Sequence, residues 1–213
     1  MGKNKETKLS IAEPNIKRAQ FYIRGTAPLV MNKFSSKAKQ QMKETQEAGS
    51  TAKKGKKREA KDFKECYENA KHVSTQGWLG IPAAAFRCAL VSACKTVGFA
   101  MTRARLAIFI EADGFDADDA APLVKILKGK PRQIESTVRL ANKSCDIHVR
   151  PMWDAGWEAK LTIAFDADQF TLEDVTNLLM RVGVQVGILE GRPGSPNSCG
   201  MGWGLFELIK PKK

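Results

Sequence analysis

The sequence predicts an α+β fold, and three observations support this class. Apolar side chains occupy every second position over residues 157–166, which is typical of a strand with one buried face. Residues 83–97 carry apolar side chains at helical spacing instead. Thr171 followed by Asp174 matches a capping box, which predicts the start of another helix. Helices and strands are therefore expected to be mixed along the 213-residue chain.

Six elements make up the predicted core. In chain order they are a strand over 21–30, a helix over 83–97, strands over 106–112 and 157–166, a helix over 171–184 and a strand over 205–209. Pro82 suits the first turn of the first helix, because its missing N–H would be unpaired there, and Gly98 is expected to end that helix. The order β-α-β-β-α-β is that of a ferredoxin-like fold, in which two helices cover one face of a four-stranded antiparallel sheet. The other face stays free, as in RRM-type modules that bind RNA.

Two segments are predicted as insertions in a single domain spanning residues 1–213. Residues 32–75 form a basic, partly mobile insertion, because their centre buries too little apolar surface to offset the entropy of ordering. Helices are expected in it over 37–47 and 59–71. Residues 135–153 contain two extended runs around a polar turn, which predicts an inserted β-hairpin. Residues 1–20 are expected to be a poorly ordered leader.

The positive charge is concentrated in the first part of the chain. The formal net charge is +12, and residues 1–80 contain 18 lysines and arginines against 8 acidic residues, whereas the rest contains 17 against 15. A polyanion is the expected partner, with nucleic acid considered first and an anionic membrane surface second. For the insertion, a solvated linker is the simpler alternative.

Cysteines and hydropathy indicate a cytoplasmic protein, of a bacterium or of a phage-infected host. The five cysteines are odd in number and form no CxxC pair, so we expect reduced thiols and neither a disulfide framework nor a zinc site. No apolar run approaches the roughly 18 to 20 residues of a membrane span, and no apolar segment follows the charged N-terminus. Neither a membrane partner nor a cofactor is predicted.

Residues 187–204 contain six glycines and have the chemistry to bind phosphates. Their order of helix, loop and strand differs from that of nucleotide-binding fingerprints, so a mononucleotide site is not predicted in this segment. Glycines such as Gly200 and Gly202 let the backbone approach a ligand and form an anion-binding nest. Arg192 adds a guanidinium and Trp203 a stacking plane. The alternative is a helix cap followed by a tight turn into a strand, with Trp203 in the core.

Both ends of the chain also carry short motifs of a known family. They are residues 23–30 (Ile-Arg-Gly-Thr-Ala-Pro-Leu-Val), Gly187, Arg192-Pro193 and residues 202–206 (Gly-Trp-Gly-Leu-Phe). These motifs and the element order resemble the RAMP superfamily, the guide-RNA-binding subunits of CRISPR effector complexes, and phage-encoded proteins with the same combination. The resemblance implies a ferredoxin-like fold, single-stranded RNA binding and, for backbone subunits, a helical filament along the strand. Residues 135–153 would then correspond to the β-hairpin thumb of those subunits.

The candidate binding residues combine basic and aromatic side chains. Basic residues of the insertion, each contributing roughly −0.7 to the log–log salt slope on a single strand, are Lys53, Lys54, Lys56, Lys57 and Arg58. Candidates on strands are Arg139, His148, Arg150 and Lys160. Candidates for stacking on bases, worth ~1 to 3 kcal/mol per base, are Trp78, Trp153 and Trp203, with a place in the core as the alternative for each.

Catalytic residues are few, so the chain is predicted not to be an enzyme. Its only histidines, His72 and His148, are expected on the surface, although either could be the base of a metal-independent endoribonuclease. Asp116, Asp118 and Asp119 lack the spacing of an EF-hand, so a solvated acidic turn is expected.

The primary functional prediction is sequence-independent binding of single-stranded nucleic acid, RNA more than DNA, as a cooperative multimer or filament. A RAMP-type endoribonuclease is one alternative. The other is a phage protein that acts through protein contacts, either as an inhibitor that mimics an effector subunit or as a structural component.

Overall fold

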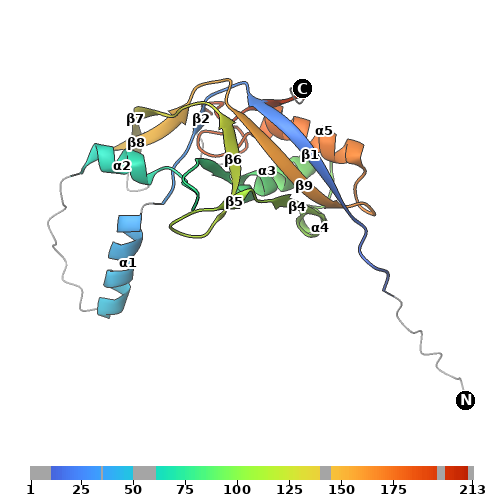
Figure 1. Cartoon of the computed structure of the whole chain (residues 1–213), viewed down its shortest axis with the longest axis horizontal. Helices are drawn as coiled ribbons and strands as arrows, with labels where there is room; N and C mark the ends of the chain where they lie inside the picture. Colours follow the sequence, from blue (N-terminus) through green and yellow to red (C-terminus); the bar gives the residue numbers. More distant parts are fainter. Residues whose placement is uncertain (1–10, 35, 50–60, 140–144, 196–199, 211–213) are drawn as a thin grey trace, which may run out of the picture.

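The chain folds into a mixed α and β structure built on antiparallel sheets (Figure 1). The computed structural model describes residues 11–34, 36–49, 61–139, 145–195 and 200–210. It has a body of one large sheet with helices on one side, and a smaller arm that extends from this body. The α+β class predicted from the sequence is therefore confirmed.

The large sheet has β9 at its centre. Its strands are β1 (Ile16–Gly25), β3 (Gly80–Pro82), β4 (Ile108–Glu111), β5 (Gly114–Phe115), β6 (Pro122–Lys128), β9 (Glu158–Asp166) and β10 (Phe206–Ile209). The order is β10-β1-β9-β6-β3, with β4 pairing β9 beside β6 and β5 pairing β6. In this register Ile23 lies opposite both Ala159 and Leu208, which places three apolar side chains on the same face.

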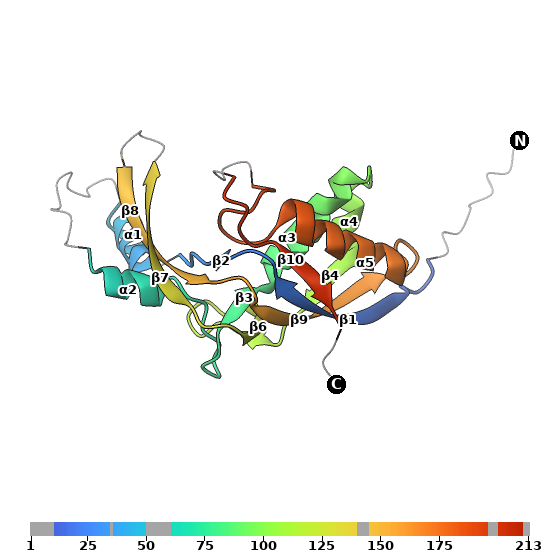
Figure 2. The same ribbon diagram turned by 90° about the horizontal axis from the view of Figure 1, so that it is seen from above.

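Three helices cover that face of the sheet. They are α3 (Ala83–Thr96), α4 (Met101–Ala107) and α5 (Leu172–Arg181), and α5 continues into the π-helical turn η2 (Val182–Val186). Figure 2 shows them together on one side of the sheet. Phe86 of α3, Leu179 of α5 and Leu161 of β9 are fully buried between the two layers. The ring of Phe206 meets the rings of Phe86 and Trp157 edge to face, with centroids 6.3 Å apart in each pair.

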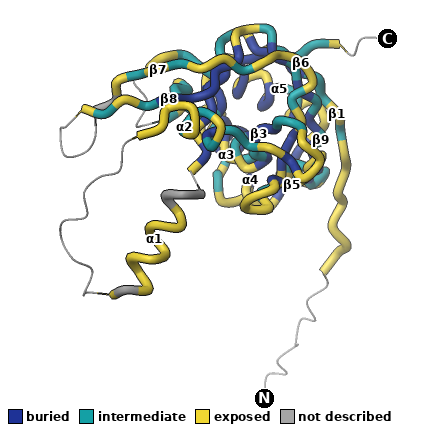
Figure 3. Tube along the Cα trace, turned by 60° about the vertical axis from the view of Figure 1, so that its left-hand side comes forward, coloured by how far each residue is buried: buried dark blue, intermediate teal, exposed yellow. Residues whose placement is uncertain are grey.

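The arm is built around a second, three-stranded sheet. Its elements are β2 (Leu29–Val30), β7 (Arg132–Arg139), β8 (Cys145–Trp153), α1 (Ser36–Ala48) and α2 (Phe63–Asn69), with strand order β2-β8-β7. The predicted hairpin is thus present, and β2 extends it into a sheet. Figure 3 shows the buried residues concentrated in the body and α1 standing away from it.

Several local predictions are confirmed. Thr171 and Asp174 form both bonds of the capping box at the start of α5. α3 begins directly after Pro82, and Gly98 just beyond it has φ +73°. Every second residue from Trp157 to Phe165 is buried, as the alternation predicted.

The prediction of one strand over 21–30 is wrong. That region contains β1 and β2, which belong to different sheets, and β1 begins at Ile16. Residues 16–20 pair with β9 through main-chain hydrogen bonds, which do not require apolar side chains. These residues therefore belong to a strand and not to the predicted leader over 1–20. The sequence also gave no prediction of α4 or β6. α4 is short and has no side-chain cap, and neighbouring residues Leu123 and Val124 of β6 are both buried, so β6 lacks a clear alternation.

Candidate functional site

The large sheet has one face that carries none of the three helices of the body. Side chains that point to this side of β1 are Arg18, Gln20, Tyr22 and Arg24. Their register partners on β9 are Ala164, Thr162, Lys160 and Glu158. Glu111 of β4 and Ile209 of β10 extend the same surface, because they pair with Thr162 and Tyr22. We term this surface the open face.

Tyr22 and Lys160 occupy the centre of the open face. As direct cross-strand partners, their Cβ atoms are about 4.5–5.5 Å apart. Both residues are half-buried, and neither side chain makes a hydrogen bond or ion pair with another described residue. A phenol ring and an ammonium group are therefore available side by side to a ligand.

Other charged groups on the open face are paired with one another. Arg18 contacts Glu111, and Arg24 lies 3.1 Å from the carboxylate of Glu158. Lys128 of β6 lies 3.5 Å from the same carboxylate. Partly exposed pairs of this kind contribute about 0–1 kcal/mol each, so a bound phosphate can replace them at little cost.

A second polar cluster joins the arm to the glycine-rich segment. Nη1 of Arg150 donates to Glu190 at 3.2 Å, and Nη2 donates to Nδ1 of His148 at 2.6 Å. Asn32 also donates to Glu190, whose own N–H donates to the carbonyl of Val30. The structure thus brings together two predicted binding residues, His148 and Arg150, and adds Glu190, which the sequence analysis did not single out.

Burial and the neighbouring charges favour the neutral form of the His148 ring. Burial, and then the positive charges of Arg150 and Lys61, lowers the pKa of His148 below 6.5, and these effects exceed the opposing ones of Asp146 and Glu190. Arg150 can only donate, so Nδ1 of His148 must be the unprotonated nitrogen. Because Arg150 is nine-tenths buried and already donates hydrogen bonds to Glu190 and His148, little of its guanidinium is accessible to an external phosphate.

The glycines of residues 187–204 allow close packing within the segment. A Cβ on Gly204 would lie 1.9 Å from the carbonyl oxygen of Ile188, and a Cβ on Gly191 would lie 2.5 Å from the ring of Trp203. Trp203 is half-buried against Gly191, and its main-chain N–H donates to the carbonyl of Gly191 at 3.2 Å. At these positions, glycine is needed for the packing of the chain itself.

Arg192 also binds the main chain of this segment. Its guanidinium donates to the carbonyl of Leu189 at 2.7 Å, where the non-glycine backbone has φ +60°. Gly200 is exposed and Gly202 half-buried, each with φ +69°. Arg192 would therefore have to exchange a backbone contact for any phosphate contact.

A third cluster lies at the base of the arm. Nζ of Lys33 donates to Asp116 and to Asp118, each at 2.6 Å, and Nδ1 of His72 lies 2.7 Å from the other oxygen of Asp116. Burial alone would raise the pKa of Asp116, but the hydrogen bonds from Lys33, from the N–H of Asp118 and from His72 outweigh it, and the pKa is lowered below 3.8. Burial alone would lower the pKa of Lys33, but its two carboxylate partners raise it above 10.5.

This cluster corrects two predictions. Asp116 is only 1% exposed, so the acidic turn is not simply solvated, and the side chain of His72 is only 12% exposed, so it is not a surface histidine. Ligand atoms of His72, Asp116 and Asp119 lie within 4.8 Å of one another, as a metal site requires. However, the oxygens of Asp116 already accept three hydrogen bonds, and the ammonium of Lys33 supplies the positive charge there.

The remaining candidates are scattered. The side chain of Arg139 lies outside the described residues. So do the basic residues at the centre of the insertion, which are Lys53, Lys54, Lys56, Lys57 and Arg58. Trp153 is fully buried, which confirms the core alternative for this residue and excludes stacking on a base. Trp78 packs over Gly80 and Gly114, where a Cβ would approach its ring to 2.9 Å and 2.7 Å. Of the strand candidates, Lys160 alone lies on the open face.

Sequence reasoning missed Tyr22, Lys33 and Glu190. Tyr22 alternates with the apolar residues Phe21 and Ile23, and this pattern would have been sufficient to propose Tyr22 as a solvent-facing binding residue. Lys33 and Asp116 are 83 positions apart, so no local pattern links them.

No protein-family model matches the chain, and no curated protein is significantly similar to it. Among the described residues, no helix combines the length and apolar character needed to cross a membrane.

Proposed function

We propose that the protein binds single-stranded nucleic acid without sequence preference, RNA more than DNA, across the open face, and that several copies bind cooperatively along one strand. The pairing of Tyr22 with Lys160 at the centre of this face carries the proposal. An aromatic ring can stack on any base, and an adjacent ammonium can neutralise a phosphate. The formal net charge of +12 favours association with a polyanion.

The direct test is binding of a fluorescently labelled oligonucleotide, measured by anisotropy over a range of salt concentrations. Tyr22→Ala should weaken binding by about 1–3 kcal/mol, which corresponds to roughly 5- to 150-fold. Lys160→Gln should reduce the log–log salt slope by about 0.7. Oligonucleotides of different base composition should bind alike.

Matched controls come from exposed residues away from the open face. Phe115→Ala removes an aromatic ring that is 55% exposed, and Lys95→Gln removes an exposed charge at the end of α3. Neither should change the affinity. An oligonucleotide that binds all four variants and the wild type equally would contradict the use of the open face, and no binding at low salt would contradict the function.

We also propose a ferredoxin-like core and a distant relationship to the RAMP superfamily. The elements β1, α3, β4, β9, α5 and β10 follow the order β-α-β-β-α-β. The strand pairs β10–β1, β1–β9 and β9–β4 are all antiparallel and support this topology. The glycine-rich segment directly before β10 supports the relationship.

A second candidate function is metal-independent cleavage of RNA, which the contact between His72 and Asp116 favours. Because Asp116 is ionised, it accepts a hydrogen bond from Nδ1 of His72 and leaves Nε2 with a free lone pair, the arrangement of an oriented general base. Labelled RNA incubated with a chelator should then yield products that disappear in His72→Ala but persist in His148→Ala. An intact substrate with the wild type would exclude this candidate.

A further inference from the structure

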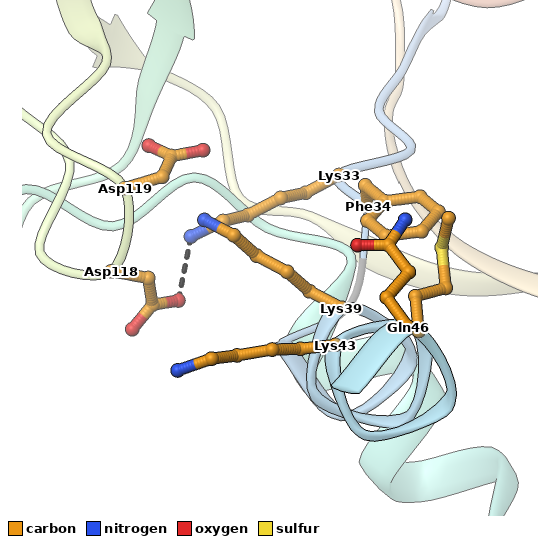
Figure 4. A pocket seen from close by; sticks show the side chains of 8 residues that line it. Lys33, Phe34, Lys39, Lys43, Gln46, Asp118 and Asp119 are labelled. Atoms are coloured by element: carbon orange, nitrogen blue, oxygen red, sulfur yellow. Dashed lines mark hydrogen bonds and ion pairs between the residues drawn. The ribbon is translucent and has the colours of Figure 1, made fainter. Parts of the chain in front are cut away.

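A cavity of about 680 Å³, open to solvent, lies between α1 and the acidic turn of Asp118 and Asp119. Figure 1 shows α1 away from β1 and β9, the central strands of the open face. Residues from three separate segments line it: Lys33, Phe34, Lys39, Met42, Lys43, Gln46, Asp118 and Asp119. Figure 4 shows the three lysines extending toward the acidic turn and Phe34 beside Gln46 at the other end. The cavity therefore has a charged end and an end with an aromatic ring, and it is open to solvent because its lining residues on α1 are exposed.

α1 presents one face to this cavity and has almost no other contact with the protein. Lys39, Met42, Lys43 and Gln46 are three or four residues apart, so they share a face of the helix. All α1 residues with described burial, residues 39–47, are exposed. A helix that buries no apolar face gains little stability from packing, so α1 can adjust its position to a ligand.

The charges at the cavity are not equally available. Lys33 is already bound to Asp116 and Asp118. Lys39 has no hydrogen bond or ion pair with a described residue, and Lys43 has only an exposed pair with Glu47 at 3.8 Å. The ammonium of Lys39 is thus free, and that of Lys43, one helical turn away, has only an exposed pair to exchange for a contact with the same anionic group.

At the other end, Phe34 is 61% exposed and Met42 is 53% exposed. A planar base would cover both side chains, since thioethers and aromatic rings pack favourably against π-systems. The amide of Gln46 can donate to and accept from a base edge, so it would tolerate any base. Asp118 is bound to Lys33, so Asp119 is the carboxylate that suits a phosphate arriving with a divalent cation, because Mg²⁺ binds one or two carboxylates together with phosphate oxygens.

We propose that this cavity binds one nucleotide, its phosphate held by Lys39 and Lys43 and its base packed against Phe34 and Met42. The nucleotide is either a free mononucleotide or one unit of a single strand. This site is separate from the open face, and each can exist without the other.

The test is titration calorimetry of the full chain with AMP and with a short oligoadenylate, with Mg²⁺ present. The double variant Lys39→Gln/Lys43→Gln should weaken binding about tenfold or more, because it removes two charge-assisted contacts, and Phe34→Ala should weaken it as well. Lys95→Gln is the matched control and should have no effect. These substitutions are on exposed side chains, and circular dichroism will verify that each variant is folded.

Saturable binding of AMP that the cavity variants weaken would support a free-nucleotide site. Weakening of the oligoadenylate alone would support a unit of a strand. The proposal is overturned if neither ligand binds or if the cavity variants bind both as the wild type does. Tyr22→Ala separates the two sites, because it should weaken the oligoadenylate and leave AMP unchanged; loss of its effect would contradict the open face and not the cavity.

Discussion

The body and the arm differ in their buried charged side chains, although Leu29 and Trp153 of the arm belong to the same apolar core as the body. The body has a continuous apolar core between its sheet and α3 and α5. The described buried residues with polar or charged side chains are Lys33 and Arg150 of the arm, Ser74 between α2 and β3, and Asp116 in the turn between β5 and β6, which Lys33 joins to the arm. Apolar burial is non-directional and independent of pH, whereas a buried ion pair needs both partners and the correct protonation state. The arm should therefore respond to pH and to single charge changes that leave the body intact.

The largest effect is expected in the body. Phe86→Ala should lower the free energy of unfolding by about 3–5 kcal/mol, because Phe86 is fully buried and its removal leaves a cavity. Urea denaturation followed by tryptophan fluorescence measures the change. Leu172→Ala, at a side chain 56% exposed, should change the value by less than about 0.5 kcal/mol. Equal losses in the two variants would mean that the core between sheet and helices is not what stabilises the body.

Asp116→Asn, in the β5–β6 turn that binds Lys33 of the arm, should have the largest effect on the arm. It leaves the buried ammonium of Lys33 with a single carboxylate, and breaking such a buried pair costs about 3 kcal/mol. Amide hydrogen exchange should accelerate in α2 and β8 and stay unchanged in β9. Asp154→Asn, which removes an exposed pair with Arg132, is the control and should leave exchange unaffected. Equal acceleration in β9 would show that arm and body open as one unit.

A smaller effect should follow from the titration of His148. Its folded-state pKa lies below 6.5, so the opened arm binds a proton more readily than the closed one. The arm is therefore most stable above pH 6.5 and loses stability as the pH falls toward the folded-state pKa. Protonation of Nδ1 removes the hydrogen bond from Arg150, which is worth about 1 kcal/mol.

Amide exchange in β8, corrected for its intrinsic pH dependence, measures this loss between neutral and mildly acidic pH. His148→Gln has no titrating ring and should show no such loss in this range. A wild type whose arm is equally protected at both pH values would contradict the assignment of His148 as the sensitive group.

Local patterns were sufficient for much of the body. The alternation from Trp157 to Phe165 and the capping box at Thr171 depend on residues within a few positions of each other, and both were predicted correctly. The open-face position of Tyr22 was also visible in the alternation of β1. β6 and α4 were not predicted, because bulges, short length and missing caps remove the periodic signal.

The sequence by itself determined where side chains alternate and where helices begin, because strand and helix periods are properties of the local backbone. Only the tertiary structure decided which distant side chains meet. It paired Lys33 with Asp116, Arg150 with Glu190 and Tyr22 with Lys160, and it assigned residues 16–30 to two sheets. The physical reason is that these contacts join residues from 40 to 138 positions apart, and their energy depends on burial and geometry that exist only after the body and the arm have folded.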